Sequence, residues 1–261
     1  MAVGNWVQRG GLYFGSIQLT SATYQGFMDE VCSQLVPDRS IAVIPQGFKA
    51  SAVFFDMDAT IIVEESLVEI SKNFGVYKQV EEITSRAMNG ELDFADSLRQ
   101  RLALIAGAPK KLLDDFIGQH HFNGGVEDAM KFFQRTGVPV FMVSGGFTYI
   151  AKAIQKRLGL NDVHANEIEI VDQVITGETI GEVVDANAKS QWMLSSVCKL
   201  GGDQSKVVAV GDGANDKEML TFAGLAVGFR PKAVLYPLLD VHIGLDQDHR
   251  FLLAALAAEK P

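Results

Sequence analysis

Three short apolar segments that end directly in small or acidic residues constrain the fold of this chain more than any other feature of its sequence. They are residues 52–55, 138–143 and 207–210, and stretches with apolar residues at helical spacing separate them. Strands that alternate with helices favour a mostly parallel sheet covered by helices on both faces. We therefore expect a doubly wound α/β fold, in which the carboxyl ends of the strands meet along one edge and form the ligand site.

The rest of the chain extends this pattern. Residues 63–118 carry apolar side chains such as Leu67 and Ile70 at helical spacing, which predicts a helical bundle inserted after the first strand. We expect a core of residues 51–62 and 126–261, an inserted helical domain of residues 63–125, and an N-terminal extension of residues 1–50 with no indicated role. Further helices are expected at 126–135, 147–158, 188–200 and 216–222, a β-ribbon at 167–184, and strands at 225–227 and 241–243.

Composition and charge exclude several classes of function. Acidic residues outnumber basic ones by 32 to 23, and the net charge of -9 disfavours a protein that binds nucleic-acid backbones through a basic surface. The apolar runs are far shorter than the roughly 20 residues of a membrane-spanning helix, and residues 1–9 lack the pattern of a secretory signal. We expect a cytoplasmic protein, a monomer or a homodimer, without nucleic-acid or membrane partners.

Four aspartates follow the first and the third of these strands. Asp56 and Asp58 come after residues 52–55, and Asp212 and Asp216 come after residues 207–210. Carboxylates that lie close together could not all remain ionised without a compensating charge. Mg²⁺ prefers carboxylate and carbonyl oxygens and completes its coordination with water and a substrate phosphate. The four aspartates therefore predict a magnesium site that acts on a phosphate group.

The second strand end and one lysine supply groups that suit this phosphate. Ser144 and the two glycines after it lead into a predicted helix, whose N-terminal N–H groups favour an anion. Lys189 adds a positive charge. Of two aspartates spaced two residues apart, one can attack phosphorus while the other protonates the leaving oxygen and later deprotonates a water. We assign the nucleophile to Asp56 and the acid and base to Asp58.

Together these residues resemble the four motifs of the haloacid dehalogenase superfamily, and the match is closer still to its phosphoserine phosphatase family. Residues 86–101 are similar to the cap signature of that family, and the spacing from Asp56 to Glu65 agrees with it. The four motifs read Asp56-Met57-Asp58-Ala59-Thr60, Ser144-Gly145-Gly146, Lys189 and Gly211-Asp212-Gly213-Ala214-Asn215-Asp216. Each motif alone is weak, but their joint occurrence in this order over residues 51–230 is specific.

The resemblance implies a fold and an activity. It implies a haloacid dehalogenase-like core with the inserted helices as a cap, and an enzyme of L-serine biosynthesis that hydrolyses O-phospho-L-serine through an aspartyl-phosphate intermediate. The implied cofactor is Mg²⁺, held by Asp56, Asp212 and the backbone carbonyl of Asp58, with Asp216 supporting metal-bound water.

The resemblance also implies roles in substrate binding. Ser144, Gly145 and Lys189 match phosphate-binding positions, and Asn215 matches a residue that helps to hold the substrate. In the cap, Glu65 would receive the substrate ammonium group and Arg101 would grip its carboxylate, a sensible pairing for a zwitterionic amino acid. Two further cap residues, Met88 and Phe94, would shield the site from water.

Some alternatives stay open. Ala59 stands where this family usually carries serine, and Glu64 lies beside Glu65, so the cap carboxylate could be either glutamate. A related magnesium-dependent phosphatase or phosphotransferase could act on another small phosphorylated metabolite. A non-catalytic phosphate- or metal-binding protein is disfavoured because all four motifs are intact. The His120-His121 pair invites a metal-site interpretation, but an exposed loop is expected instead.

Overall fold

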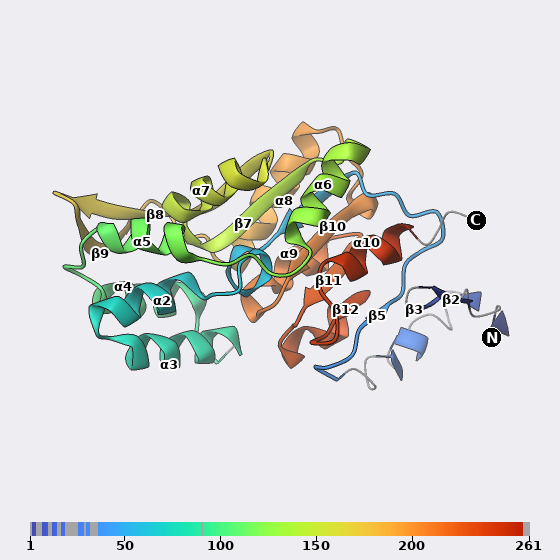
Figure 1. Cartoon of the computed structure of the whole chain (residues 1–261), viewed down its shortest axis with the longest axis horizontal. Helices are drawn as coiled ribbons and strands as arrows, with labels where there is room; N and C mark the ends of the chain where they lie inside the picture. Colours follow the sequence, from blue (N-terminus) through green and yellow to red (C-terminus); the bar gives the residue numbers. More distant parts are fainter. Residues whose placement is uncertain are drawn as a thin grey trace.

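One central sheet organises the part of the chain that the computed structural model describes (Figure 1). That part is residues 26–28, 30–31, 36–89 and 91–257, with the backbone of four short strands within residues 2–18. The strands lie in the order β5 (Ile41–Ala42), β12 (Val241–Ile243), β11 (Leu225–Phe229), β10 (Val207–Gly211), β6 (Ala52–Phe55), β7 (Val140–Phe147), β8 (Asp162–Val171) and β9 (Val174–Ile180). Neighbours from β12 to β8 pair parallel, and only the edge strands β5 and β9 pair antiparallel. The predicted doubly wound, mostly parallel fold is confirmed.

The strand β6 shows why the sheet is covered on both faces. Its four side chains are buried, and successive side chains of a strand point to opposite faces. Val53 and Phe55 belong to the apolar cluster under α6 (Val126–Thr136), α7 (Thr148–Leu158) and α10 (Arg250–Ala257). Phe54 belongs to a second cluster under α8 (Ala186–Lys199) and α9 (Lys217–Phe222). A continuous apolar run therefore forms a central strand between two layers of helices.

The strand order reverses between β6 and β10. The chain runs from β6 outward through β7 to β8, and then returns to place β10 on the other side of β6. In open α/β sheets, ligands bind beyond the carboxyl ends of the strands at such a reversal. The residues that follow β6 and β10 are the predicted aspartates, so the topology itself places them at the expected ligand site.

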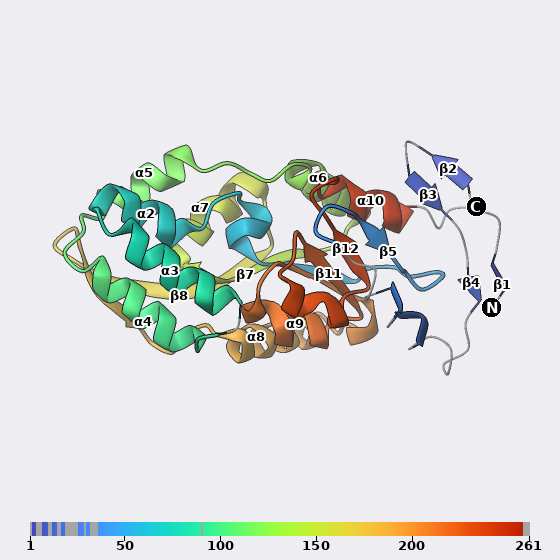
Figure 2. The ribbon, with the colours of Figure 1, turned by 90° about the horizontal axis from the view of Figure 1, so that it is seen from below.

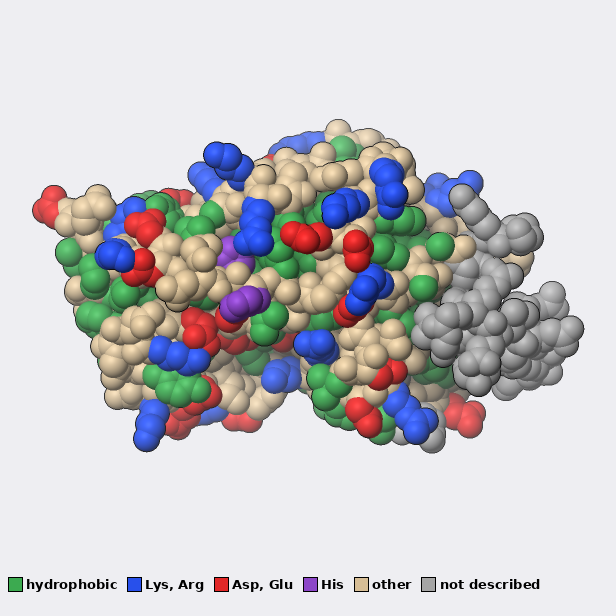
Figure 3. Space-filling model, in the orientation of Figure 1, with side chains coloured by type: hydrophobic (Ala, Val, Ile, Leu, Met, Phe, Trp, Pro, Cys, Tyr) green, Lys and Arg blue, Asp and Glu red, His purple; other side chains and the backbone are tan. Residues whose placement is uncertain are grey.

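Four helices between β6 and α6 form a separate group at one end of the molecule (Figures 1 and 2). They are α2 (Ser66–Phe74), α3 (Tyr77–Met88), α4 (Phe94–Leu104) and α5 (Lys111–Gln119). The link between α4 and α5 pairs with β9, since Gly107 donates its N–H to the Ile175 carbonyl at 2.9 Å and Ile175 donates to the Ala108 carbonyl at 2.8 Å. In the space-filling view, a notch separates the lobe of α2 and α3 from the sheet (Figure 3).

Most elements agree with the sequence expectations to within two residues, and two differ by more. The predicted strand 138–143 is β7, which begins at Val140 and continues through the Ser-Gly-Gly motif to Phe147, with an irregular register after Val143. The predicted ribbon begins earlier, because β8 first pairs with β7 and then turns back as β9. Asp172 and Gln173 form the tight turn with positive φ angles of 50° and 63°, as two-residue hairpin turns require.

Shorter elements complete the description. In the N-terminal region, β1 (Ala2–Val3) pairs with β4 (Ile17–Gln18), and β2 (Val7–Arg9) pairs with β3 (Leu12–Phe14). An irregular turn η1 (Met57–Ile61) follows β6, and the 3-10 helices are η2 (Gln204–Lys206), η3 (Ala214–Asp216) and η4 (Ala233–Leu238). Among the described residues, no helix combines the length and the apolar character needed to cross a membrane.

Candidate active site

Three buried carboxylates meet at the edge of the sheet. The strands β6 and β10 pair with Phe55 opposite Val210, and the N–H of Asp56 donates to the Val210 carbonyl at 2.9 Å. Asp56 therefore lies beside the loop that carries Asp212 and Asp216. One carboxylate oxygen of each of these three aspartates lies within 4.8 Å of the other two.

Lys189 reaches this cluster from α8. Asp185 caps the start of the helix, since its carboxylate accepts the N–H of Ala188 at 2.8 Å, so Lys189 stands in the first turn. Its fully buried ammonium lies 2.6 Å from Asp56 Oδ1 and 2.7 Å from Asp216 Oδ1. Burial alone would lower the pKa of Lys189, but the two carboxylates outweigh it and raise that pKa. The lysine is therefore a fixed positive charge beside the predicted nucleophile.

Asp216 uses both oxygens to hold the loop after β10. Oδ1 accepts from Lys189, and Oδ2 accepts the N–H groups of Asp212 at 3.0 Å and Gly213 at 3.3 Å. A Cβ atom at Gly211 would lie 2.4 Å from Asp216 Oδ2, so this contact requires glycine. Asp216 is thus a supporting group, whereas Oδ1 of Asp212 is buried with no hydrogen-bond partner within the described part of the chain.

The pKa values of the clustered carboxyl groups are raised, and a bound cation would lower them. Burial, then the nearby Asp216 carboxylate, raises the pKa of Asp56 to about 7 in spite of Lys189. Burial and the same neighbour also raise the pKa of Asp212 well above its usual value. A divalent cation between them would favour the ionised forms. The unpartnered oxygen of Asp212 and the all-oxygen donor set fit Mg²⁺.

Asp58 lies on the irregular turn η1 and faces the N-terminus of α2. Ser66, the first residue of α2, donates its N–H to Asp58 Oδ1 at 3.1 Å and its hydroxyl to Oδ2 at 3.0 Å. Burial, then the neighbouring Glu65, raises the pKa of Asp58 to about 7, although the bonds from Ser66 oppose the shift. A carboxyl group with a pKa near neutrality can both give and take a proton.

The turn η1 is held from outside by residues that the sequence did not indicate. Asn123 donates from Nδ2 toward the carbonyls of Ala59, Thr60 and Ile62 at 2.9–3.1 Å. His249 lies with Nε2 2.9 Å from the Thr60 carbonyl. Ala59 has a φ of 54°, an unusual conformation for a residue with a side chain. These contacts over-determine the turn that carries Asp58.

The predicted phosphate-binding motif, residues 144–146, lies at the end of β7. Ser144 is buried, and its hydroxyl accepts the N–H of Gly146 at 2.8 Å. A Cβ atom at Gly145 would lie 2.3 Å from the Phe94 ring of α4. The helix α7 begins only at Thr148, so the motif belongs to the bulged strand end rather than to the first turn of the helix. Gly145 therefore lets a ring from the inserted helices approach the backbone.

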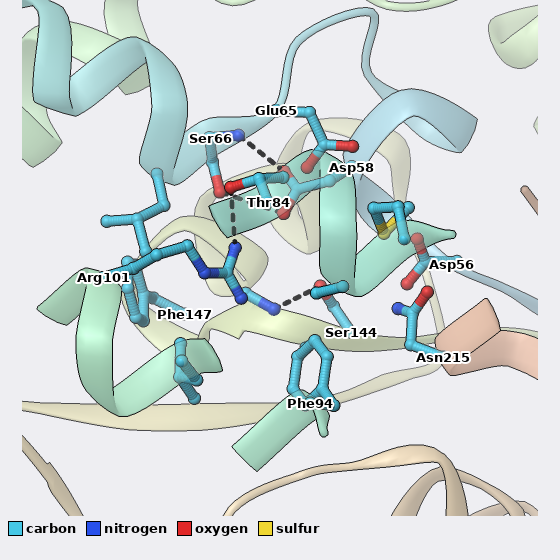
Figure 4. A pocket seen from close by; sticks show the side chains of 16 residues that line it. Asp56, Asp58, Glu65, Ser66, Thr84, Phe94, Arg101, Ser144, Phe147 and Asn215 are labelled. Carbon is cyan, nitrogen blue, oxygen red and sulfur yellow. Dashed lines mark hydrogen bonds between the residues drawn. The ribbon is translucent and has the colours of Figure 1, made fainter. Parts of the chain in front are cut away.

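These groups surround one pocket between the sheet edge and the inserted helices (Figure 4). Arg101 lies on one side of the pocket, Asp56 lies on the opposite side, and Glu65 lies on a third. The lining also includes Asp58, Ser144, Gly145, Asn215, Met88 and Phe94. The structure therefore brings these predicted residues to one place, and Lys189, Asp212 and Asp216 lie just behind Asp56.

The two adjacent glutamates have different surroundings. Glu64 accepts the His121 N–H with both oxygens at 3.1 Å and lies 2.7 Å from His121 Nδ1. Glu65 lines the pocket, and burial, then the Asp56 carboxylate, raises its pKa to about 7 in spite of Arg101. Only Glu65 is placed to meet a substrate.

The expectation that His120 and His121 lie in an exposed loop is confirmed for His121 and wrong for His120. His121 is exposed, but His120 is buried between Phe116, at a ring-centroid distance of 5.9 Å, and Phe122, at 5.3 Å. Burial lowers the pKa of His120. Neither histidine belongs to a group of metal-binding side chains among the residues described. Phe116 precedes His120 by four residues at the end of α5, so helical spacing is a local signal for this contact.

Comparison with known proteins identifies the family of this chain. The family model for haloacid dehalogenase-like hydrolases matches residues 53–221. Because the match covers more than half of the chain, the chain belongs to the haloacid dehalogenase-like hydrolases.

Several similar proteins within this family are named phosphoserine phosphatases. A phosphoserine phosphatase of Idiomarina loihiensis is 37% identical over 191 residues, which are 73% of this chain and 87% of that protein. One of Streptomyces coelicolor is 39% identical over 198 residues, 75% of this chain but only 48% of the relative. The chain thus spans about half the length of the Streptomyces protein. A solved substrate-bound phosphoserine phosphatase complex is 34% identical, with a TM-score of 0.76 and coverage of 79% of this chain and 98% of that one.

Proposed function

We propose that this chain is a phosphoserine phosphatase, which hydrolyses O-phospho-L-serine to L-serine and phosphate. The observation that carries the proposal is that one pocket holds Asp56 and Asp58 together with the opposite charges of Glu65 and Arg101. A phosphorylated amino acid has a phosphate, an ammonium group and a carboxylate, and each would meet a group of matching charge or chemistry. The names of the similar proteins agree with this substrate.

The proposed cofactor is Mg²⁺. Asp56, Asp212 and the backbone carbonyl of Asp58 would hold it, and Asp216 would support water bound to it. When bound, the cation would neutralise the carboxylate cluster and draw electron density from the phosphate oxygens. The proposed location in the cytoplasm and the proposed monomer or homodimer stay predictions from the sequence.

The proposed reaction has two displacements at phosphorus. A carboxylate oxygen of Asp56 attacks phosphorus as the bond to the serine oxygen breaks, and protonated Asp58 gives its proton to that oxygen. L-serine and an aspartyl-phosphate result. Ionised Asp58 then takes a proton from water, which attacks the same phosphorus as its bond to Asp56 breaks. Phosphate leaves, and ionised Asp56 and protonated Asp58 are restored. Lys189 and Ser144 would neutralise and orient the phosphate oxygens in both steps.

We propose that residues 63–125 act as a cap over this reaction. Two cap side chains already touch core glycines, since added Cβ atoms would lie 2.3 Å from the Phe94 ring at Gly145 and 2.3 Å from the Met88 methyl at Gly213. Such contacts would exclude water during attack by Asp56. The cap would have to open to admit the substrate and to release serine.

A phosphate-release assay tests the proposal. With Mg²⁺ present, we expect kcat/KM for O-phospho-L-serine to exceed that for O-phosphoethanolamine, 3-phosphoglycerate and p-nitrophenyl phosphate by at least about tenfold, about 1.4 kcal/mol of transition-state binding. Equal activity on all four would contradict a phosphoserine phosphatase and favour a general phosphatase. Transfer to an added homoserine acceptor instead of release would favour the phosphotransferase alternative.

A further inference from the structure

The guanidinium of Arg101 is held by neutral groups alone. Its Nε donates to the Ser97 carbonyl at 3.2 Å, Nη1 donates to the Thr84 hydroxyl at 3.2 Å, and Nη2 donates to the Ser97 hydroxyl at 3.3 Å. Arg101 is only 6% exposed. Within the described residues, no carboxylate lies within the 4.0 Å of an ion pair with it. The positive charge is therefore fixed in position but not neutralised.

The guanidinium of Arg101 keeps two N–H donors that bind none of the described residues. A guanidinium has five N–H donors, one on Nε and two on each terminal nitrogen. The three hydrogen bonds to Ser97 and Thr84 use one donor on each nitrogen. One N–H remains on Nη1 and one on Nη2. One N–H on each terminal nitrogen is the number of donors needed to bind both oxygens of a carboxylate.

Thr84 contributes the acceptor that comes from a different helix. It belongs to α3, is 5% exposed and lines the pocket, and Figure 4 shows its bond to Arg101. Its hydroxyl also lies 2.8 Å from the Val80 carbonyl, to which it donates. Because its one hydrogen goes to that carbonyl, its oxygen can only accept from Arg101. The direction of the bond to Arg101 is therefore fixed, and α3 is tied to α4 at the pocket wall.

We propose that Thr84 is a positioning residue that sets the selectivity for substrates with a carboxylate, by holding the Arg101 fork in register. The proposal rests on the proposed function, since it assumes that the carboxylate of phosphoserine binds Arg101. Without the Thr84 hydroxyl, a buried N–H of Arg101 would lose its partner, and the guanidinium would rotate to find another. The phosphate chemistry of Asp56 and Asp58 would be unaffected, because the hydrogen bonds of Thr84 go to Val80 and Arg101.

Two substrates that differ in one group test this role. O-phosphoethanolamine keeps the phosphate and the ammonium group of O-phospho-L-serine and lacks its carboxylate. For Thr84→Val we expect the KM for O-phospho-L-serine to rise about tenfold with kcat within twofold, and kcat/KM for O-phosphoethanolamine to change by less than twofold. Thr84→Ser, which keeps the hydroxyl, should remain within threefold of the wild type for both substrates.

Two further variants separate positioning from stability. Ser71 is a buried helical serine whose hydroxyl donates to the Val68 carbonyl at 2.6 Å, so Ser71→Ala is the matched control and should not alter the ratio between the substrates. Ser97→Ala removes the acceptor of Nη2 and should reproduce the Thr84→Val pattern even if the valine variant fails to fold.

The outcomes distinguish the two proposals. Loss of the same size on both substrates in Thr84→Val and in Ser97→Ala, or unchanged KM for O-phospho-L-serine in both, would overturn the positioning role alone. A wild-type chain that does not prefer O-phospho-L-serine over O-phosphoethanolamine would overturn the proposed function, and the role of Thr84 with it.

Discussion

At the scale of single residues, the neighbours Glu64 and Glu65 differ in their surroundings: Glu64 bonds to His121, and Glu65 lines the pocket proposed to bind the substrate. Glu64 binds the backbone N–H of His121, which connects the two segments that lead into and out of the inserted helices. Glu65 faces the pocket. The family resemblance alone could not choose between them, because both lie in the same short loop and neither helical nor strand spacing applies there. The choice depends on which carboxylate finds a backbone donor.

A pair of matched substitutions checks this division. Glu65→Gln should raise the KM for O-phospho-L-serine at least about tenfold, because it removes the charge proposed to bind the ammonium group. Glu64→Gln should leave that KM within twofold and lower the free energy of unfolding by about 1 kcal/mol, the typical contribution of a hydrogen bond. Steady-state kinetics and urea unfolding on both variants measure these effects. A larger rise in KM for Glu64→Gln would reverse the assignment.

Other contacts of the site could not be predicted from the sequence for a related reason. The aspartates could be predicted because each follows an apolar strand, and topology brings strand ends together. Thr84 and Arg101 are 17 residues apart on different helices, so their contact exists only once α3 packs on α4. His249 follows β12, the last strand of the sheet along the chain, and still contacts the turn η1 that follows β6.

At the scale of elements, the turn η1 depends on a buried histidine whose pKa is lowered by the fold. The ring of His249 is fully buried, stacks on Phe229 at 4.0 Å and donates from Nε2 to the Thr60 carbonyl. Its Nδ1 has no hydrogen-bond partner in the described structure. Burial lowers the pKa of His249 to about 4, because a proton on Nδ1 would place an unpaired charge in the core.

This depressed pKa predicts a pH dependence of stability. The folded chain binds a proton at His249 only near pH 4, whereas the unfolded chain binds one near pH 6.5, so stability is lost as the pH falls through this interval. Between pH 7 and pH 5 the loss from this group is about 2 kcal/mol. The buried carboxyl groups with raised pKa values stabilise the fold as the pH falls, which is the opposite effect. They are the same in the wild type and in a variant without the His249 imidazole, so the difference between the two proteins measures the effect of His249.

The comparison uses His249→Phe, which keeps an aromatic ring against Phe229 and cannot titrate. We expect urea unfolding to show a decrease in stability from pH 7 to pH 5 that is about 2 kcal/mol larger in the wild type than in the variant. Parallel pH profiles for the two proteins would show that His249 is accessible to protons in the folded chain.

The elements that the sequence predicted are those with a local signal. Strands β6 and β10 are continuous apolar runs, and helices such as α6 have a clear apolar face. The turn η1 has no local signal, because contacts with Asn123 and His249 impose its unusual backbone. The sequence predicts no element at α10, and the helix covers the sheet through side chains such as Phe251 and Leu252.

At the scale of the whole molecule, the chain combines a sheet that gathers acidic groups with a helical lobe that covers them. The described surface in Figure 3 carries charges of both signs, with apolar side chains in small groups between them. The concentration of like charge lies inside instead, where Asp56, Asp212 and Asp216 are all buried. Such a cluster destabilises the fold unless a cation compensates it.

Cation binding should therefore stabilise the whole chain. At a Mg²⁺ concentration about 100 times its Kd, we expect the free energy of unfolding to rise by about 2.7 kcal/mol. Asp212→Asn should lose most of this increase, whereas Asp203→Asn, at an exposed aspartate bonded to Ser205, should keep it. Thermal unfolding with added Mg²⁺ and with a chelator measures the effect. The same increase in wild type and Asp212→Asn would place the cation elsewhere.

The most direct test of the proposed aspartyl-phosphate is to detect the phosphoryl group on the enzyme. The chain is quenched in acid during turnover of O-phospho-L-serine, digested, and its peptides are examined by mass spectrometry. We predict one phosphoryl group on Asp56, absent in Asp56→Asn, which should also lose turnover while keeping its unfolding midpoint. A phosphoryl group on another residue, or full turnover by Asp56→Asn, would contradict the account.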